Sequence, residues 1–146
     1  MQYDFLHNMY KMPVSMVKNI HNENELIDTI RNNFTVSHAK NFISYSKLSI
    51  NTWSKILPIS MRTLQRSLDN KKKALDITVS ETFIEIGEIY NIGLSAFNND
   101  KDRLNDWFFT GNAYFNHKKP IDIMDTHKGR DLIKSELTRI EYSEFS

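Results

Sequence analysis

The sequence contains no cysteine, and this absence excludes several kinds of site at once. A disulfide framework, a zinc site with thiolate ligands and a cysteine nucleophile all require this residue. Glycine and proline are also scarce, with four and three copies in 146 residues. An all-β fold with many tight turns needs more of both residues, so the composition disfavours that class. The lack of cysteine suits a reducing compartment.

Long apolar runs are missing as well. No stretch approaches the roughly 20 consecutive apolar residues that a membrane-spanning helix needs. Near the N-terminus, Asp4 stands where a secretory signal would be basic, and no apolar run follows it. We therefore expect a cytoplasmic protein that does not enter a membrane. The hydrophobic fraction of 40% is large enough to form a buried core.

The net charge is only +1, so the total favours no class of partner, but the charges are unevenly distributed. Between Met61 and Lys73 there are five cations and one anion, Asp69, which gives a local charge of +4. A cationic segment of this kind is the electrostatic footprint expected of a nucleic-acid contact. The alternative is an ordinary solvated helix face. The five cations are Arg62, Arg66, Lys71, Lys72 and Lys73.

Apolar residues recur every three or four positions along most of the chain, which predicts an all-α fold. Residues that commonly begin or end helices separate these periodic segments. The longest predicted helix reaches from a Thr-x-x-Glu capping box to about Phe97. The expected caps and end points are, in chain order, Ser37, Ser49, Ser60, the Thr78–Glu81 pair, Gly111, Pro120 and Thr126.

Two segments raise specific questions about burial. Residues 1–22 are too apolar for a solvated tail, so they are expected to pack on the body of the protein or on a second subunit. Their apolar residues are Tyr3, Phe5, Leu6, Met9, Tyr10 and Met12. In the last helix, the periodicity predicts an inner face made of Leu132, Ile133, Leu137 and Ile140.

Residues 48–68, LSINTWSKILPISMRTLQRSL, match the pattern of a helix-turn-helix. A first helix with buried anchors precedes a short turn and a second helix, in which Leu64 and Leu68 are expected to be buried. Positions 62, 65, 66 and 69 of the second helix share one face. Arginine can donate two hydrogen bonds to guanine, and glutamine pairs in the same way with adenine. The predicted DNA-binding residues are Ser60, Arg62, Thr63, Gln65, Arg66, Lys71, Lys72 and Lys73, the hydroxyls and lysines serving phosphates.

Enzyme chemistry finds little support in the sequence. The five histidines are scattered and lack the spacing of metal ligands. Glu81, Glu85 and Glu88 share a helix face, for which a solvated acidic surface is the simpler interpretation. No glycine-rich phosphate loop and no serine nucleophile motif is present. We therefore expect a protein without catalytic residues, metal or cofactor.

Four segments in order carry a family resemblance: LIDTIRNNF, ISMRTLQRSL, NAYFNHKKPIDIM and DTHKGRDLIKSELTRIEYSEFS. From about Leu26 to Ser146 the chain resembles the Xre/MbcA/ParS antitoxins of type II toxin–antitoxin systems. The second segment is similar to the family's S-x-R-T-L-x-R-x-L recognition helix. The last one is similar to its T-x-x-G…L-x-R-I-E terminus, through Thr126, Gly129, Leu137, Arg139, Ile140 and Glu141.

The resemblance implies a partner toxin with a RES domain, which depletes NAD. It also implies a homodimer that binds operator DNA and regulates its own operon. In such complexes the C-terminal residues of the antitoxin reach the toxin active site, which makes the tail from Arg139 to Ser146 the candidate inhibitory element. The candidate toxin-binding residues are Arg139, Glu141, Tyr142, Glu144, Phe145 and Ser146.

The expected organisation is an N-terminal extension at 1–22, a helix-turn-helix domain at 23–73 and a dimerisation and toxin-binding domain at 74–146. Pro58 and Ser143 stand where family members usually carry glycine, and neither residue favours a positive φ. The paths of the turn and of the tail are therefore open. Two other functions also stay open: a stand-alone helix-turn-helix regulator, and a protein–protein module whose helix-turn-helix no longer binds DNA.

Overall fold

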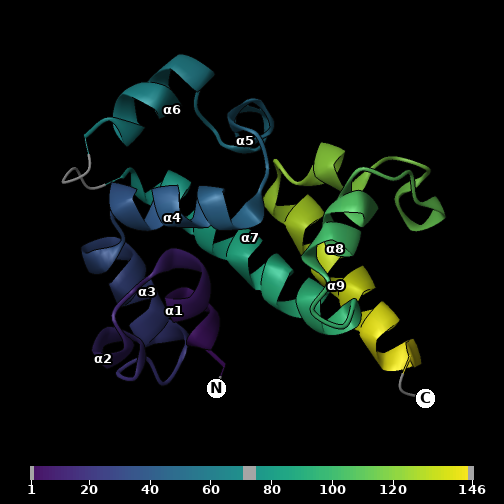
Figure 1. Ribbon diagram of the computed structural model, residues 1–146, viewed down its shortest axis with the longest axis horizontal. Helices are drawn as coiled ribbons and strands as arrows, with labels where there is room; N and C mark the ends of the chain where they lie inside the picture. The colour runs from purple at the N-terminus through teal and green to yellow at the C-terminus, as the bar shows by residue number, and fades with distance from the viewer. Residues whose placement is uncertain (1, 71–74, 145–146) are drawn as a thin grey trace. The chain divides into compact units, whose positions relative to one another are not determined.

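A computed structural model describes residues 2–70 and 75–144, with the side chain of Glu144 excepted. Every regular element within these ranges is helical, which confirms the all-α prediction (Figure 1). The chain forms two compact units, Met1–Gly87 and Glu88–Ser146. The boundary between the units falls within α7 (Ile77–Ala96). None of the described helices combines the length and the apolar character of a membrane span.

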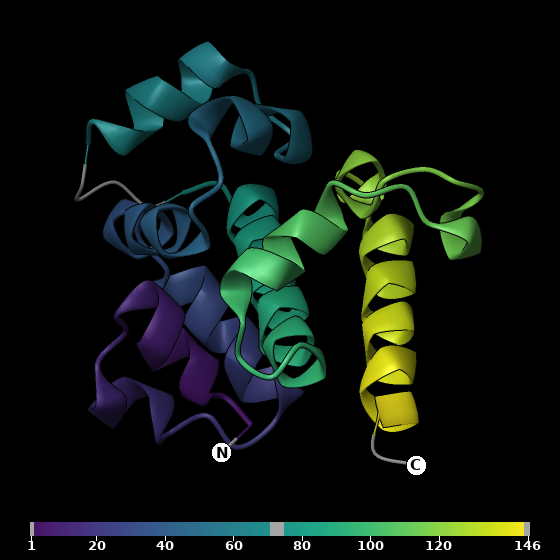
Figure 2. The same cartoon turned by 45° about the vertical axis from the view of Figure 1, so that its right-hand side comes forward.

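The first unit consists of short helices around an aromatic core. α1 packs against α2 and α4, and α6 packs against α4 and α5. The first half of α7 completes the unit (Figure 2). The bounds are Asp4–Tyr10 for α1, Val14–Val17 for α2, Glu23–Asn33 for α3, Val36–Ser46 for α4, Ile50–Ile56 for α5 and Met61–Leu68 for α6.

Tyr10 and Trp53 organise the core of the first unit. The ring of Tyr10 stacks on Phe42 with centroids 4.5 Å apart, and its hydroxyl donates to the carbonyl oxygen of Phe83. Trp53 lies 5.0 Å from the ring of Phe83 and donates its indole N–H to the Ser46 hydroxyl. The polar atoms of both side chains therefore have partners, which makes their complete burial favourable.

The apolar residues of the N-terminal segment are buried within this unit. Leu6, Tyr10 and Met12 have no exposed surface. Tyr3, Phe5 and Met9 are at most 6% exposed. Of the two sequence-based possibilities, packing on the body of the protein is the correct one. A second subunit is not needed to cover them.

The predicted serine caps of α5 and α6 are confirmed. The caps of α4 and α7 differ from the predicted Ser37 and Thr78–Glu81 pair. Ser49 and Ser60 accept hydrogen bonds from the N–H groups of Thr52 and Thr63. In α4, however, Thr35 replaces Ser37 as the cap and forms a capping box with His38. The helix begins two residues earlier than predicted because Val36 is fully buried and belongs to the inner face.

His38 acts in this box as a hydrogen-bond acceptor. Its Nδ1 atom accepts the N–H of Thr35 at 3.1 Å. Burial lowers the pKa of His38, against the opposing effect of a hydrogen bond to the backbone of Asn33. The neutral imidazole that burial favours is the form with an acceptor nitrogen.

The start of α7 also departs from the predicted capping box. Asp76 accepts the N–H of Thr78 at 2.9 Å, one position before the first residue of the helix. An aspartate at this position is as effective a cap as a threonine and also interacts favourably with the helix dipole. The helix α7 ends at Ala96, one residue before the predicted end at about Phe97.

The second unit packs short helices around the end of α7. Tyr90 donates its hydroxyl to Asn105 at 2.7 Å, and its ring makes an edge contact with Phe108. At Gly93, an added Cβ would lie 2.6 Å from Leu104, so α7 and α8 approach closely here. The bounds are Lys101–Phe108 for α8, Ala113–Phe115 and Pro120–Ile123 for the 3-10 helices η1 and η2, and His127–Glu144 for α9.

The inner face of α9 is only partly as predicted. Ile133 and Leu137 are fully buried, and Ile140 is half-buried. The prediction for Leu132 was wrong, since 49% of this residue is exposed. Adjacent residues on a helix point about 100° apart, so Leu132 and Ile133 cannot both face the centre of the same core.

Candidate functional site

The two helices of the helix-turn-helix form as predicted and are anchored by buried apolar residues. Trp53, Ile56 and Leu57 hold the first helix, α5. Leu64 is fully buried and holds the second, α6, whereas Leu68 is only half-buried. One strong anchor therefore fixes the rotation of α6 about its axis. This rotation decides which side chains face solvent.

The outward face of α6 contains the predicted DNA-reading residues. Arg62, Gln65 and Arg66 are all exposed, with Asp69 at the C-cap of the helix. Because Leu64 faces inward, the long donor side chains at 62, 65 and 66 project together. Their arrangement allows bidentate contacts to base edges in a major groove.

The hydroxyls predicted to hold phosphates have a role in capping. Ser60 accepts the N–H of Thr63 at 3.1 Å and donates its own hydroxyl to the Thr63 oxygen at 2.9 Å. The Thr63 hydroxyl proton is left for another acceptor, such as a phosphate oxygen. The third part of the predicted phosphate contact, Lys71 to Lys73, lies outside the described residues.

Pro58 is accommodated without a left-handed backbone on either side of it. Leu57 has φ −76° and Ser60 has φ −70°, and both are extended. The exposed Pro58 lies between them. None of residues 57–60 has a positive φ, so the absence of glycine does not prevent the turn from forming.

A compact loop presents Tyr114 at the surface of the second unit. The carbonyl oxygen of Asn112 accepts the N–H groups of Phe115 and His117, at 3.0 and 2.8 Å. The Asn112 N–H donates to Lys118, and the Asn112 side chain accepts from Tyr114. Phe115 is buried against Trp107, whereas Tyr114 is 50% exposed. The hydrogen bonds of the loop therefore hold the exposed ring of Tyr114 in place. The sequence analysis did not single out this residue.

Two consecutive left-handed residues close this loop. Asn116 has φ 55° and His117 has φ 65°. Asparagine and histidine are both enriched among the non-glycine residues that adopt this conformation. The hydrogen bonds that Asn112 makes across the loop hold the two residues in it.

The predicted inhibitory tail begins as the end of α9. Arg139, Glu141 and Tyr142 are helical residues, and Ser143 is too, so the terminal motif needs no left-handed residue there. The Ser143 hydroxyl donates to the Ile140 carbonyl oxygen at 2.9 Å. The side chain of Glu144, and all of Phe145 and Ser146, lie outside the described residues.

Arg139 and Tyr142 are the predicted tail residues that the structure places at the surface. Tyr142 is 72% exposed, whereas Glu141 is half-buried. Arg139 donates from Nε and Nη2 to the two carboxylate oxygens of Glu136, at 2.8 and 2.6 Å. Only 3% of the Glu136 side chain is exposed. This bidentate contact raises the pKa of Arg139 and fixes the orientation of its guanidinium group.

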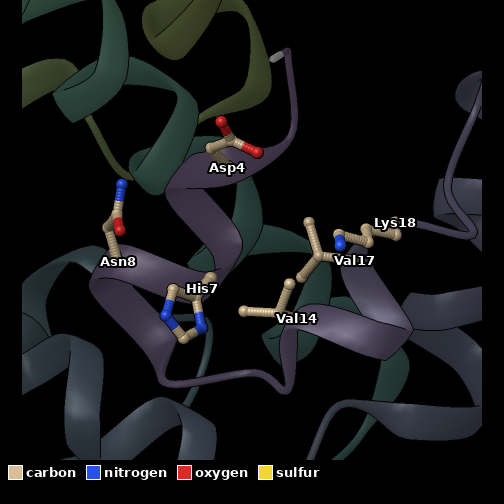
Figure 3. A pocket seen from close by; sticks show the side chains of 6 residues that line it. All are labelled: Asp4, His7, Asn8, Val14, Val17 and Lys18. Carbon is tan, nitrogen blue, oxygen red and sulfur yellow. The ribbon is translucent and has the colours of Figure 1, made fainter.

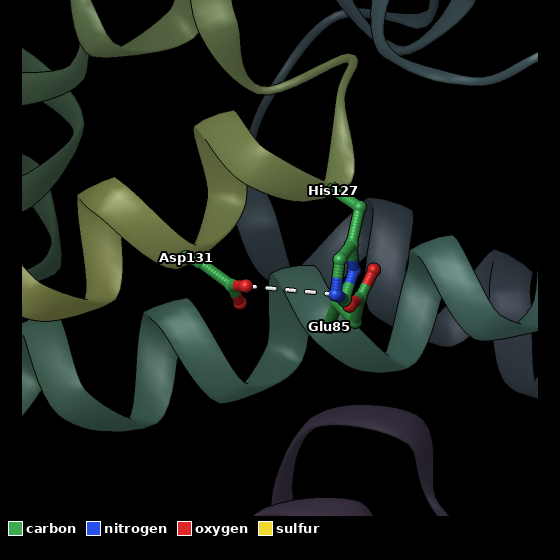
Figure 4. Close-up of side chains that lie close together, drawn as sticks. All are labelled: Glu85, His127 and Asp131. Carbon is green, nitrogen blue, oxygen red and sulfur yellow. Dashed lines mark ion pairs between the residues drawn. The ribbon is translucent and has the colours of Figure 1, made fainter.

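Two polar residues at the start of α9 make a surface contact. His127 and Asp131 form an ion pair of 3.5 Å at the start of α9, with both side chains mainly exposed (Figure 4). Such a surface pair contributes little to stability.

In the N-terminal segment, a hollow of about 250 Å³ is lined by Asp4, His7, Asn8, Val14, Val17 and Lys18 (Figure 3). The His7 imidazole hydrogen-bonds the Met12 carbonyl oxygen and so holds the turn after α1.

One comparison with known proteins bears on the second unit. Residues 94–142 match the profile of the antitoxin Xre/MbcA/ParS C-terminal toxin-binding domain. The matched region contains α8, η1, η2 and α9 as far as Tyr142, and so includes the Tyr114 loop and the Arg139–Glu136 pair. No curated protein matches the chain.

Proposed function

We propose, from the premise that the chain belongs through residues 94–142 to the Xre/MbcA/ParS antitoxins, that it neutralises a RES-domain, NAD-depleting toxin by binding it directly. The match to the toxin-binding domain is the observation that carries this proposal. The exposed Tyr142 and the oriented Arg139 support it, since tyrosine and arginine are common anchors at protein interfaces. The end of α9 and the residues after it reach the toxin active site.

The proposed mechanism is steric and electrostatic, without a catalytic step. The C-terminal end of the antitoxin occupies the site where the toxin would bind its dinucleotide. The carboxylates of the tail and of the C-terminus substitute there for the dinucleotide phosphates. The matched domain is a binding module, and neither a metal nor a cofactor takes part. The protein acts in the cytoplasm, where the toxin would consume NAD.

The helix-turn-helix supplies a second activity in this proposal. The homodimer binds operator DNA through Arg62, Gln65 and Arg66 on each copy and represses its own operon. Support comes from the common exposure of these three side chains and from the capped N-terminus of α6. In this proposal the segment 23–73 binds DNA, the segment 74–146 dimerises and binds the toxin, and the segment 1–22 is an N-terminal extension.

Co-expression with the protein encoded beside this chain tests the toxin proposal. The two proteins should copurify, and the complex should leave NAD intact, while the partner alone consumes it. A chain that lacks residues 142–146 should release the toxin activity, because the inhibitory end is lost. If the neighbouring protein does not bind, the chain is better described as a stand-alone regulator.

The DNA-binding prediction concerns Arg62 and Arg66. Replacing either with alanine should weaken operator binding by about 1–3 kcal/mol, because each loses a bidentate base contact. Both side chains are exposed, so thermal unfolding should be unchanged. A mobility-shift titration at fixed salt measures the effect. Arg31→Ala, at an exposed arginine of α3, is the matched control and should bind normally. Equal affinity of all three variants would contradict the assignment of Arg62 and Arg66 as base contacts, and a chain that shifts no operator DNA at all would support the module without DNA binding.

A further inference from the structure

Two adjacent hollows lie along the N-terminal segment, beside α1 and α2. The first has a volume of about 250 Å³, and the second has a volume of about 330 Å³. Three residues line both hollows and so form their junction: Asp4, Val17 and Lys18. The junction therefore carries a carboxylate, an ammonium group and an apolar side chain. The second hollow is completed by Gln2, Tyr3, Ile20 and His21.

The two charges at the junction do not pair with each other. Asp4 lies in the first turn of α1, and Lys18 is the C-cap of α2. Within the part of the chain that the structure describes, the Lys18 ammonium makes no ion pair with Asp4 or with another carboxylate. An ionised carboxylate has about four acceptor positions, so Asp4 can bind a ligand ammonium in addition to its contacts within the chain. A ligand that carries both charges can therefore bind between them.

The first hollow has an apolar wall and a polar wall. Figure 3 shows the side chains of Val14 and Val17 directed toward α1. On the α1 side, Nδ1 of His7 lies 2.8 Å from the Met12 carbonyl oxygen. A carbonyl oxygen can only accept, so Nδ1 carries the proton and Nε2 of the neutral ring is an acceptor. The polar wall thus favours a ligand with donor groups.

The second hollow adds mainly apolar surface to the junction. Tyr3 and Ile20 are 6% and 7% exposed. The Tyr3 hydroxyl donates to Glu23 at 3.4 Å, and Nδ1 of His21 lies 2.9 Å from Glu25. The polar groups of these two side chains therefore already have partners.

The size of the first hollow favours a small ligand. Its volume is equivalent to about eight water molecules at about 30 Å³ each. Pockets for drug-sized ligands usually begin at about 300 Å³. An α-amino acid is small enough, and it carries its ammonium and carboxylate groups on the same carbon atom. An aliphatic side chain on that carbon matches the wall made of two valines.

We propose that the hollow between α1 and α2 binds a free α-amino acid with an aliphatic side chain. The ligand ammonium binds Asp4, the ligand carboxylate binds Lys18, and the ligand side chain packs on Val14 and Val17. The site precedes both the helix-turn-helix and the matched domain at 94–142. The proposal does not rest on the proposed function.

A ligand at this site would stabilise the first unit. α1 ends at Tyr10, whose ring stacks on Phe42 in the core of that unit. A ligand that binds the folded unit and not the unfolded chain raises stability by mass action. L-Leucine should therefore raise the thermal unfolding midpoint of the first unit, with Trp53 fluorescence as the readout.

Calorimetric titration of the full chain with L-leucine tests the site. We expect a Kd of about 0.1–1 mM, as befits a small ligand in a partly open hollow. Two analogues of leucine each lack one charge: isoamylamine lacks the carboxylate, and isocaproate lacks the ammonium group. Each should bind about 10-fold more weakly than leucine, because one charge at the junction loses its partner.

Lys18→Ala tests the recognition of the carboxylate. It should weaken leucine binding about 10-fold and leave leucine and isoamylamine with equal affinity, because the group that distinguishes them is gone. Loss of folding alone would not equalise the two ligands. Lys55→Ala, at an exposed lysine of α5, is the matched control and should bind leucine normally.

Val14→Asp tests the apolar wall. The new carboxylate replaces an apolar contact and repels the ligand carboxylate, so leucine binding should no longer be detectable. Ile27→Asp is the matched control, because Ile27 is 43% exposed and lines neither hollow. It should bind leucine as the unmodified chain does. Both positions are exposed, so circular dichroism should record the same helix content in both variants.

Three outcomes would overturn the proposal. The first is no heat from leucine at concentrations well above the expected Kd. The second is equal binding of leucine and isoamylamine to the unmodified chain, since the carboxylate would then not be recognised. The third is leucine binding that survives both Lys18→Ala and Val14→Asp, which would place the ligand elsewhere. None of these outcomes bears on the toxin or the operator, whose binding is measured separately.

Discussion

Replacing Gly129 with alanine is expected to destabilise the second unit severely. An added Cβ would lie 1.7 Å from the carbonyl oxygen of Ile123 and 2.8 Å from the Thr126 hydroxyl oxygen. A backbone oxygen cannot move aside as a side chain can, so η2 and the start of α9 would have to separate. The cost should be at least about 3 kcal/mol, at the upper end of the range for overpacking.

The junction around Gly129 explains why the effect should spread. The Gly129 N–H donates to the Thr126 hydroxyl at 2.9 Å. The next residue, Arg130, is buried and donates from Nη1 to the Met124 carbonyl oxygen at 3.0 Å. Separation of the two helices would break the hydrogen bond from the buried Arg130 to Met124, and the loss of a hydrogen bond at a buried cation is costly.

Denaturant unfolding followed by circular dichroism measures this effect. Lys128→Ala is the control for stability, because it changes the neighbouring exposed residue to a good helix former. It should unfold within about 0.5 kcal/mol of the unmodified chain. A Gly129→Ala protein that is equally stable would mean that the close approach to Ile123 is not present in solution.

The second large effect is expected at Trp53, in the core of the first unit. Trp53→Ala should cost about 3–5 kcal/mol, because a fully buried aromatic side chain leaves a cavity. The change also removes the donor to the Ser46 hydroxyl, which itself accepts from the Leu48 N–H. Since α5 packs against α6, the operator binding proposed for α6 should fall with the stability of the unit.

The two tryptophans allow each unit to be followed by itself. Trp53 lies in the first unit and Trp107 in the second, and the chain has no others. In Trp53→Ala, the fluorescence of Trp107 should report a nearly unchanged second unit, while circular dichroism records early loss of helix. Lys55→Ala, at an exposed residue of α5, is the control. A single unchanged transition in Trp53→Ala would contradict the role given to this core.

Local chemistry made several features predictable. The hydroxyls of Ser49 and Ser60 satisfy helix N–H groups three residues further on, a relation that the sequence displays directly. The exposed face of α6 was predictable for the same reason, since Leu64 fixes the direction of Arg62, Gln65 and Arg66. Such relations extend over one or two turns of helix and do not depend on distant residues.

The predictions failed where two local solutions compete. Thr35 and Asp76 are as suitable for capping as the residues that were preferred. Burial of Val36 favoured Thr35, whereas at α7 an aspartate also interacts favourably with the helix dipole. Leu132 and Ile133 are equally apolar, so their periodicity alone could not say which one faces the core.

The sequence by itself therefore determined the all-α class, the position of the helix-turn-helix and the set of side chains on its outer face. It also carried the family pattern of the second unit. Only the tertiary structure decided that Leu132 is exposed, that Glu136 orders Arg139 and that Tyr114 stands on a closed loop. The physical reason is that periodicity and capping act within a helix, whereas exposure and the pairing of side chains depend on how separate segments pack.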